Sequence, residues 1–321
     1  MPLTAQDAVG FAQTFKAVVD NISLALLDKT HPIRLVVTAL FSGGHVLLED
    51  APGTGKTVLA RSLAASIDGT HSRIQFTPDM LPSDITGVNI YDQKTSAWEF
   101  RRGPIFAEIV LADEINRASP KTQSALLEAM AESQITVDGV THPASDPFMV
   151  IATQNPIEQA GTYPLPEAQL DRFLIKTSLG YPARAAMIDV LDGAVAPDRS
   201  RRLGPVIAAG DVVGWSAAVG ETYIDRAVLD YIAALVEATR ADETAMLGVS
   251  TRGAIGMARC ARVWAAAQGR NYVLPDDVKE LAGSVWEHRV VMDPDALFSG
   301  STAAGVVAKA LVTVPAPAVG V

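Results

Sequence analysis

A glycine-rich run that ends in Lys-Thr is the stretch of this sequence best suited to hold phosphate. Residues 48–60 read LEDAPGTGKTVLA and lie between an apolar run and a helix-like segment. Glycines let the backbone turn several N–H groups toward an anion, while Lys56 would reach the β- and γ-phosphates and the Thr57 hydroxyl would ligate Mg²⁺. We therefore predict that ATP and Mg²⁺ bind at this loop through Ala51, Pro52, Gly53, Thr54, Gly55, Lys56, Thr57 and Val58.

An acid, Asp50, stands where the usual G-x-x-x-x-G-K-[ST] pattern has its first glycine. The residues expected to touch phosphate, Gly53 to Thr57, are intact. Position 50 lies where the predicted strand gives way to the loop. We therefore expect a working loop in which the Asp50 carboxylate points away from the phosphates, toward a basic group.

Two adjacent acids provide the second half of a nucleotide-hydrolysing site. In IVLADEINRA the apolar residues 109–112 predict a buried strand, and Asp113 and Glu114 follow at its end. Neighbouring side chains on an extended chain point in different directions, so the two carboxylates can do different work. We predict that Asp113 holds Mg²⁺ and that Glu114 is the general base for the attacking water. Without the glycine loop, such a pair would more simply be a solvated strand end.

The elements that must position these residues are short apolar runs that alternate with longer amphipathic stretches. The runs are HVLLE (45–49), RIQFT (73–77), AEIVLAD (107–113) and FMVIATQN (148–155). Continuous apolar strands separated by helices predict an α/β fold whose parallel sheet is covered on both faces. Ligands of such sheets collect at the carboxyl ends of the strands, where the polar residues lie.

Helical patterns dominate after residue 181. One apolar stripe at helical spacing comprises Val228, Tyr231, Ile232, Leu235 and Val236. We predict an ATPase core over 1–181 and a helical lid over 182–299. The segment 300–321 is small, apolar and punctuated by proline, so we expect a loosely held tail.

Charge and cysteine content limit the functions that are open to the chain. Lys and Arg number 26 against 36 Asp and Glu, which gives a formal charge of −10 and disfavours a generic nucleic-acid binder. Cys260 is the single cysteine, so no disulfide can form within the chain. No run approaches the roughly 18 apolar residues of a membrane span. We expect a cytoplasmic protein without a membrane span.

Several separated motifs together resemble one family. LEDAPGTGKT, GPIFAEIVLADEINRASPKTQSALLEAM, VIATQNPIEQAGTYPLPEAQLDRF and GVSTRGA resemble the MoxR branch of the AAA+ ATPases, in the same order along the chain. This branch belongs to the helix-2-insert clade and is related to the ATPase subunits of magnesium chelatase. The resemblance covers roughly residues 20–295. It implies a P-loop NTPase core with a parallel five-stranded sheet between helices, followed by a small all-α lid.

The resemblance also implies roles for three residues that spacing alone would leave as ordinary polar positions. Asn155 is similar to the first sensor near the γ-phosphate, although Asn-Pro is also a turn signal. Arg172 is similar to the arginine finger, which acts on nucleotide bound by a neighbouring subunit, or else pairs with Asp171. Arg252 is similar to the second sensor, which links the lid to the phosphates, or else simply begins a helix. Arg117 either faces the adjacent subunit or forms a local ion pair.

Two insertions are similar to hairpins of this clade, one over about 87–103 and one over about 133–147. In members that move DNA, such hairpins carry basic residues toward a central pore. Residues 128–150 contain no Lys or Arg, which argues against a DNA motor, whereas Lys94, Arg101 and Arg102 on the other insertion keep that alternative open.

The leading hypothesis is an ATP-driven remodelling or assembly factor that works as a homo-oligomeric ring, which we expect to be hexameric. The resemblance implies a protein client and a partner with a von Willebrand factor A domain. The alternatives are an ATPase subunit of a metal-insertion complex similar to magnesium chelatase, a DNA motor, and a ring scaffold without hydrolysis. The intact acids at 113 and 114 argue against the scaffold.

Overall fold

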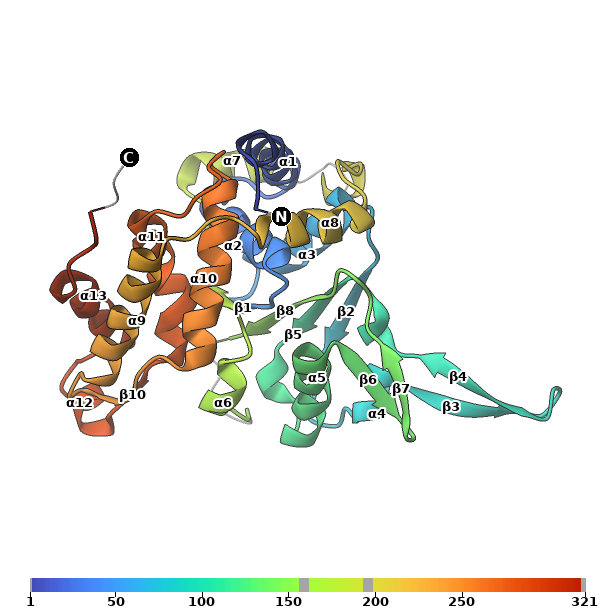
Figure 1. Ribbon diagram of the computed structural model, residues 1–321. Helices are drawn as coiled ribbons and strands as arrows, with labels where there is room; N and C mark the ends of the chain where they lie inside the picture. The colour runs from blue at the N-terminus through green and yellow to red at the C-terminus, as the bar shows by residue number, and fades with distance from the viewer. Residues whose placement is uncertain (1, 156–161, 193–198, 319–321) are drawn as a thin grey trace.

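The structure is a computed structural model that describes residues 2–155, 162–192 and 199–318. At its centre lies a five-stranded sheet in the order β2-β5-β8-β1-β9, and every neighbouring pair of strands is parallel (Figure 1). These strands are β1 Val46–Glu49, β2 His71–Gln75, β5 Ile109–Asp113, β8 Met149–Gln154 and β9 Ile175–Thr177. The predicted α/β class and the parallel five-stranded sheet are confirmed.

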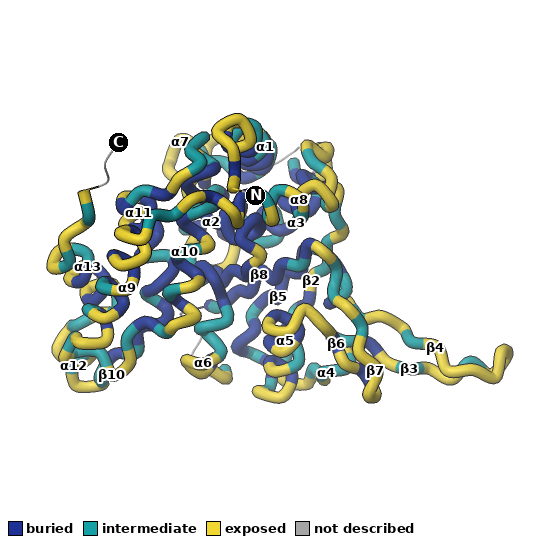
Figure 2. The backbone as a smooth tube through the Cα atoms, in the orientation of Figure 1, coloured by how far each residue is buried: buried dark blue, intermediate teal, exposed yellow. Residues whose placement is uncertain are grey.

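Alternate residues of each strand pack on opposite faces of the sheet. In β5, Ile109 and Leu111 belong to one buried cluster, and Val110 and Ala112 belong to another. The helices on the first face are α1 Ala5–Ser23, α2 Thr30–Phe41 and α3 Lys56–Ser66; those on the second are α4 Pro82–Thr86 and α5 Pro120–Glu132. Because helices cover both faces of the sheet, its strands are continuous apolar runs. The sheet is the buried centre of the molecule in Figure 2.

Both insertions form antiparallel hairpins, β3 (Gly87–Asp92) with β4 (Ala97–Arg102) and β6 (Gln134–Val137) with β7 (Val140–Pro143). The second turns at Asp138 and Gly139, which both have positive φ, as the Asp-Gly signal predicts. The first projects far from the body (Figure 1). The second hairpin lies against the first along one side. The Phe100 ring stacks on His142 with 4.3 Å between ring centroids, and Asn89 Nδ2 donates to Asp138 Oδ2, in the turn of the second hairpin, at 2.8 Å.

The lid is helical and packs against the first face of the core. Its main helices are α9 Arg226–Arg240, α10 Thr251–Ala266 and α11 Pro275–Trp286. All five residues of the apolar stripe predicted for 228–236 are buried in α9. The same buried cluster that covers the sheet continues through α10 and α11, so apolar packing joins lid and core without a break.

The other elements of the described ranges are shorter. The helices are α6 Glu167–Leu170, α7 Arg184–Asp192, α8 Ala209–Val219, α12 Pro294–Phe298 and α13 Ala303–Thr313, with short 3₁₀ turns at η1 Pro104–Phe106, η2 Ile115–Arg117, η4 Arg199–Arg202 and η5 Glu287–Arg289. The strands β10 Ala245–Leu247 and β11 Val291–Met292 form a small ladder in the lid. No helix of the described ranges is long and apolar enough to cross a membrane.

The expectation of a loosely held tail over 300–321 is wrong for residues 303–313, which form α13. Val306, Val307 and Ala310 are buried in the cluster that α9 and α11 share. The Thr302 side chain caps the helix, and Lys309 Nζ pairs with Asp242 at 2.9 Å. Small residues suggested weak packing, but here they give a helix a narrow apolar face that fits closely against the lid.

Candidate functional site

The glycine loop connects β1 to α3 and is shaped to present N–H groups. Gly53 and Gly55 have φ of 82° and 100°, a region that residues with a Cβ seldom adopt. A Cβ on Gly55 would also lie 2.6 Å from Leu26 Cδ1, so both the backbone angle and the neighbouring side chain favour glycine there. Thr54 Oγ1 donates to the Ala51 carbonyl at 3.3 Å and stabilises the turn. Helix α3 then begins at Lys56, with its positive end toward the loop.

The Asp50 carboxylate points away from the phosphate loop, as expected. Its oxygens accept hydrogen bonds from the backbone N–H groups of Leu179 at 2.6 Å and Gly180 at 2.8 Å, where the chain leaves β9. The expected basic partner is therefore wrong, because two free amides past the end of β9 satisfy the charge. Lys56 Nζ donates to the backbone carbonyl of Asp50 at 3.2 Å, so this contact leaves the Asp50 carboxylate to the amides after β9.

The paired acids lie at the carboxyl end of β5. Asp113 Oδ1 accepts from Thr153 Oγ1 at 2.6 Å, and Oδ2 pairs with the Arg73 guanidinium at 2.6 Å. Glu114 has left-handed backbone geometry with φ 57°, and its N–H donates to Thr153 Oγ1 at 2.9 Å. The turn directs the two carboxylates differently, as required for two roles.

Two donors hold the Glu114 carboxylate. Gln75 Nε2 donates to Oε2 at 2.8 Å, and Arg117 NH1 pairs with the same oxygen at 3.0 Å. Of the two alternatives for Arg117, the structure therefore contains the local ion pair. Before Glu114 can polarise a water, this oxygen or its partner Oε1 must be available to that water.

One cavity of about 390 Å³ brings the loop and the acids together. Its lining consists of Pro52, Gly53, Gly55, Lys56, Thr57, Val58, Arg73, Gln75, Asp113, Glu114 and Asn155. Strand β8 lies between β1 and β5, so Asn155 at its end stands between the glycine loop and the acids. The Thr57 hydroxyl and the Asp113 carboxylate are oxygen donors of the kind that Mg²⁺ takes beside nucleotide phosphates, so the lining fits that ion.

Sequence reasoning missed Arg73 and Gln75. They are alternate residues of RIQFT and therefore share one face of β2, which the sequence could have indicated. The missing information is that β2 pairs with β5 in a register that sets Gln75 opposite Asp113. Strand order in a parallel sheet comes from tertiary packing, and no local signal gives it.

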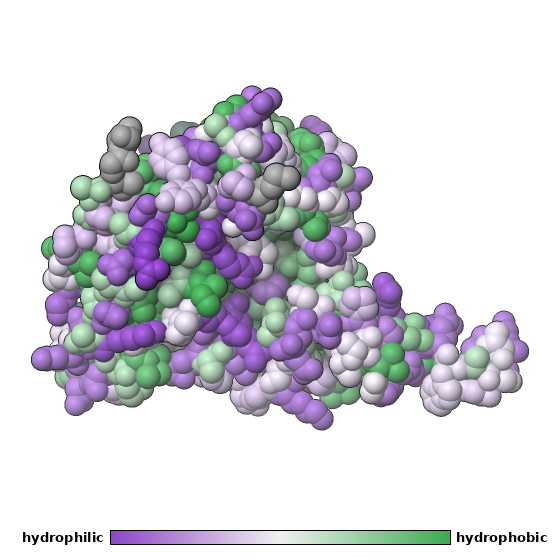
Figure 3. Space-filling view, in the orientation of Figure 1, coloured by the Kyte–Doolittle hydropathy of each residue, from purple (hydrophilic) through white to green (hydrophobic). Residues whose placement is uncertain are grey.

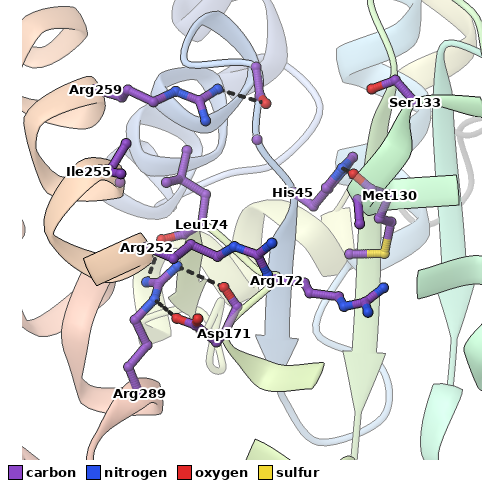
Figure 4. Close-up of a pocket in the computed structure, with 14 residues that line it drawn as sticks. His45, Met130, Ser133, Asp171, Arg172, Leu174, Arg252, Ile255, Arg259 and Arg289 are labelled. Atoms are coloured by element: carbon purple, nitrogen blue, oxygen red, sulfur yellow. Dashed lines mark hydrogen bonds and ion pairs between the residues drawn. The ribbon is translucent and has the colours of Figure 1, made fainter. Parts of the chain in front are cut away.

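Arg172 and Arg252 do not reach this cavity. They line a second cavity of about 500 Å³ between core and lid, together with His45, Arg259 and Arg289 (Figure 4). Arg252, expected to link the lid to the phosphates, thus does not line the cavity of the phosphate loop in its own chain. The reason is that α10 begins beside the end of α6, where the Ser250 hydroxyl donates to Asp171 at 2.9 Å. Asp171 pairs with Arg289 and not with its neighbour Arg172, whose NH1 donates to the Leu127 carbonyl.

His45 forms one wall of the second cavity and is neutral. Its Nδ1 accepts the Val150 N–H at 3.0 Å, and Nε2 lies 3.0 Å from the Met130 carbonyl, to which it donates. Complete burial lowers the pKa of His45 to about 4, with the Arg259 charge adding to the shift. The positive charge of this cavity therefore comes from its arginines.

A glycine loop after β1, acids after β5, a polar residue after the strand between them and a helical lid together define the AAA+ class of ATPases. A family model described as "ATPase family associated with various cellular activities (AAA)" matches residues 45–175, and a model of the AAA lid domain matches residues 237–309. The chain belongs to the MoxR family of these ATPases, as two relatives that carry this name indicate.

The relatives align over most of their length. The uncharacterized protein YeaC of Bacillus subtilis (strain 168) is 48% identical over 299 residues, 93% of either chain. Chaperone MoxR1 of Mycobacterium tuberculosis is 37% identical over 328 residues, which cover 99% of this chain and 86% of the relative. Protein MoxR of Methylorubrum extorquens is 30% identical, covering 85% of this chain and 86% of the relative. A crystal structure of a candidate ATPase from Cytophaga hutchinsonii superposes with a TM-score of 0.91 at 36% identity and covers 98% of both chains.

Proposed function

We propose that this chain hydrolyses ATP at a site that a second copy of the chain completes. The observation that supports this most is the division of the charged residues between two cavities. The loop, the acids and Asn155 line the first cavity, here called the phosphate cavity. Arg172 and Arg252 line the second, here called the arginine cavity. A neighbour in a ring can bring Arg172 and Arg252 of its arginine cavity to the phosphate cavity of this chain, where neither residue of the same chain lies.

Within the first cavity, each residue has a role that its position supports. The loop amides and Lys56 bind the phosphates, and Glu114 takes a proton from the attacking water while the Asn155 amide orients that water. Mg²⁺, held by Thr57 and Asp113, would neutralise charge on the β- and γ-phosphates. Gln75 orients Glu114 by the hydrogen bond described above.

The arginines act across the interface. Arg172 meets the charge that develops on the γ-phosphate of the neighbour's nucleotide, an interaction that can contribute roughly 10³ to 10⁵ in rate. Arg252 stands beside Arg172 in Figure 4, so it would act on the same nucleotide rather than on its own.

Mixing two inactive variants tests the shared site. Arg172→Ala keeps a complete phosphate cavity, and Glu114→Gln keeps a complete arginine cavity. Each alone should turn over ATP at least about 100-fold more slowly than the wild type, and a mixture should recover a measurable part of the activity. A phosphate-release assay over a range of mixing ratios measures this. Full turnover by a strictly monomeric wild type, with no recovery at any ratio, would exclude the proposal.

For the biological role we propose an ATP-driven remodelling or assembly factor in the cytoplasm, acting as a hexameric ring. The support is membership of a family in which one relative is named a chaperone. A client protein and a partner with a von Willebrand factor A domain follow from the same family. Affinity capture with Glu114→Gln in ATP, with Lys56→Ala as the control that cannot hold ATP, should enrich both. Enrichment of porphyrin-metallating subunits instead would favour the chelatase-like alternative.

A further inference from the structure

The arginine cavity is built from two parts of the chain that one carboxylate joins. Asp171, in the core directly before Arg172, accepts from Arg289 Nε at 2.8 Å and from Ser250 Oγ at 2.9 Å. Arg289 and Ser250 both belong to the lid. The Arg289 side chain is only 2% exposed, and its ion pair is drawn in Figure 4. A charge buried to this degree is costly unless it is fully paired.

Arg289 uses its remaining donors on the segment that carries Arg172. NH2 donates to the Phe173 carbonyl at 2.7 Å, and NH1 donates to the Leu174 carbonyl at 3.1 Å. NH1 also donates to the Val285 carbonyl of α11, the helix that directly precedes η5. The guanidinium therefore fixes the backbone on the C-terminal side of Arg172 relative to the lid.

Ser250 extends the same linkage to Arg252. It is the N-cap of α10, and its Oγ also accepts the Gly253 N–H at 3.0 Å, so it fixes the turn that contains Arg252. The backbone of this turn lies very close to the linkage. A Cβ on Gly253 would be 2.8 Å from Arg289 Cδ, and one on Gly256 would be 2.9 Å from Leu174 Cδ1. Residues 253 and 256 must be small for the two parts to meet.

This linkage is not needed merely to keep lid and core together. A single apolar cluster already runs from the sheet into α10 and α11 and includes Leu174, Met257 and Trp286. A buried ion pair also fixes the relative orientation of the two parts, because a guanidinium and a carboxylate bind in a fixed mutual geometry. Arg172 in the core and Arg252 in the lid can reach one nucleotide together only if core and lid keep that orientation.

We infer that Asp171, Ser250 and Arg289 form a latch that holds Arg172 and Arg252 in one register, so that both reach the neighbour's nucleotide together. The inference rests on the proposed shared site. The three latch residues are positioning residues, since the phosphates would meet Arg172 and Arg252. The latch matters, therefore, only in the subunit that supplies the arginines.

The mixture of Arg172→Ala with Glu114→Gln allows the latch to be altered on either side of the interface. In its productive sites the Glu114→Gln subunit supplies the arginines, and the Arg172→Ala subunit supplies the nucleotide. Adding Asp171→Asn to the Glu114→Gln subunit should lower turnover at least about tenfold, because a small misplacement of a charged group is costly. Adding it to the Arg172→Ala subunit should change turnover less than about twofold. Affinity for a fluorescent ATP analogue should stay the same, since the latch does not line the phosphate cavity.

Matched controls separate positioning from stability. Asp277→Asn breaks another buried ion pair of the lid, with Arg270 NH2 at 2.6 Å from Asp277 Oδ1, and neither residue lines the arginine cavity. Asp277→Asn should change the turnover of the mixture by the same factor whether the Glu114→Gln subunit or the Arg172→Ala subunit carries it. If Asp171→Asn does not fold, Ser250→Ala takes its place, with Thr302→Ala as the control that removes the N-cap of α13.

Equal losses on both sides of the interface, or no loss in the arginine-supplying subunit, would overturn the latch. Failure of the proposed shared site gives a different result, because the parent mixture itself would then recover no activity.

Discussion

The two acidic side chains of the phosphate cavity already form hydrogen bonds and ion pairs with neighbouring side chains. Asp113 pairs with Arg73, and Glu114 accepts from both Gln75 and Arg117. Glu114 also has a left-handed backbone, which costs of order 1–3 kcal/mol for a residue with a Cβ and persists only where surrounding contacts enforce it. Metal must therefore compete with protein donors for the Asp113 carboxylate, and water must compete with them for Oε2 of Glu114.

Arg73→Ala should strengthen the binding of Mg²⁺ with nucleotide. The guanidinium lies 2.6 Å from Asp113 Oδ2, so its removal frees one oxygen of the carboxylate that would hold the ion. A half-exposed pair of this kind is worth up to about 1 kcal/mol, which corresponds to roughly a fivefold lower Mg²⁺ midpoint. Titration of Mg²⁺ against fluorescent-nucleotide binding measures the midpoint. Arg101→Ala, on the exposed strand β4, is the control. A midpoint that rises in Arg73→Ala would mean that Arg73 contacts the phosphates instead.

At the scale of the secondary-structure elements, His45 connects β1, α5 and β8 by hydrogen bonds. His45 precedes β1, donates to the Met130 carbonyl of α5 and accepts from the Val150 N–H of β8. A second buried histidine, His288, lies 2.9 Å through Nε2 from the Phe173 carbonyl and links η5 to the chain before β9. Burial lowers the pKa of both imidazoles, so the folded state keeps them neutral in mildly acidic solution.

Acid should destabilise the fold through these histidines. Unfolded His45 takes a proton below its ordinary pKa of 6.5, whereas folded His45 stays neutral down to about 4, so stability falls as the pH drops through this window. For His45 alone the loss between about pH 7 and pH 5 is about 2 kcal/mol. In urea unfolding at the two pH values, the free energy of unfolding of the wild type should fall by about 2 kcal/mol more than that of His45→Gln. His142→Gln, on the hairpin, should retain the wild-type dependence.

How far the sequence predicts these elements depends on how local each signal is. The apolar runs predicted four of the five core strands, all but β9. The Asp-Gly pair predicted the turn of the β6–β7 hairpin, and the spacing in 228–236 predicted the face of α9. The partners of Asp50, the approach of Arg73 to Asp113 and the packing of α13 all depend on segments distant in sequence. The glycine loop and acids could be assigned from their spacing because each directly follows its strand. The location of Arg252 could not, because it depends on how the lid lies on the core.

The molecule as a whole is acidic, with a formal charge of −10. Polar and apolar side chains are interspersed over the face drawn in Figure 3, and the β3–β4 hairpin extends from it. The basic residues of that hairpin, Lys94, Arg101 and Arg102, alternate with Asp92 and Glu99. This mixed charge suits a protein surface better than a phosphate backbone.

DNA should therefore leave ATP turnover unchanged. At about 50 mM salt, single- or double-stranded DNA should alter the rate less than about twofold, and binding should lack the steep salt dependence that phosphate contacts give. Phosphate release and a salt titration of fluorescence anisotropy measure the two quantities. DNA-stimulated turnover that is lost in Arg101→Glu would instead support the motor alternative.

The projecting hairpin also gives the molecule a spectroscopic reporter. Of the four tryptophans, Trp264 and Trp286 are completely buried, whereas Trp98 near the hairpin tip is 71% exposed and contacts Tyr91 edge-on, with ring centroids 5.5 Å apart. Collisional quenchers such as acrylamide will reach Trp98 far more readily than the buried indoles. Its emission can thus follow what the hairpin touches while the buried tryptophans report on the integrity of the lid.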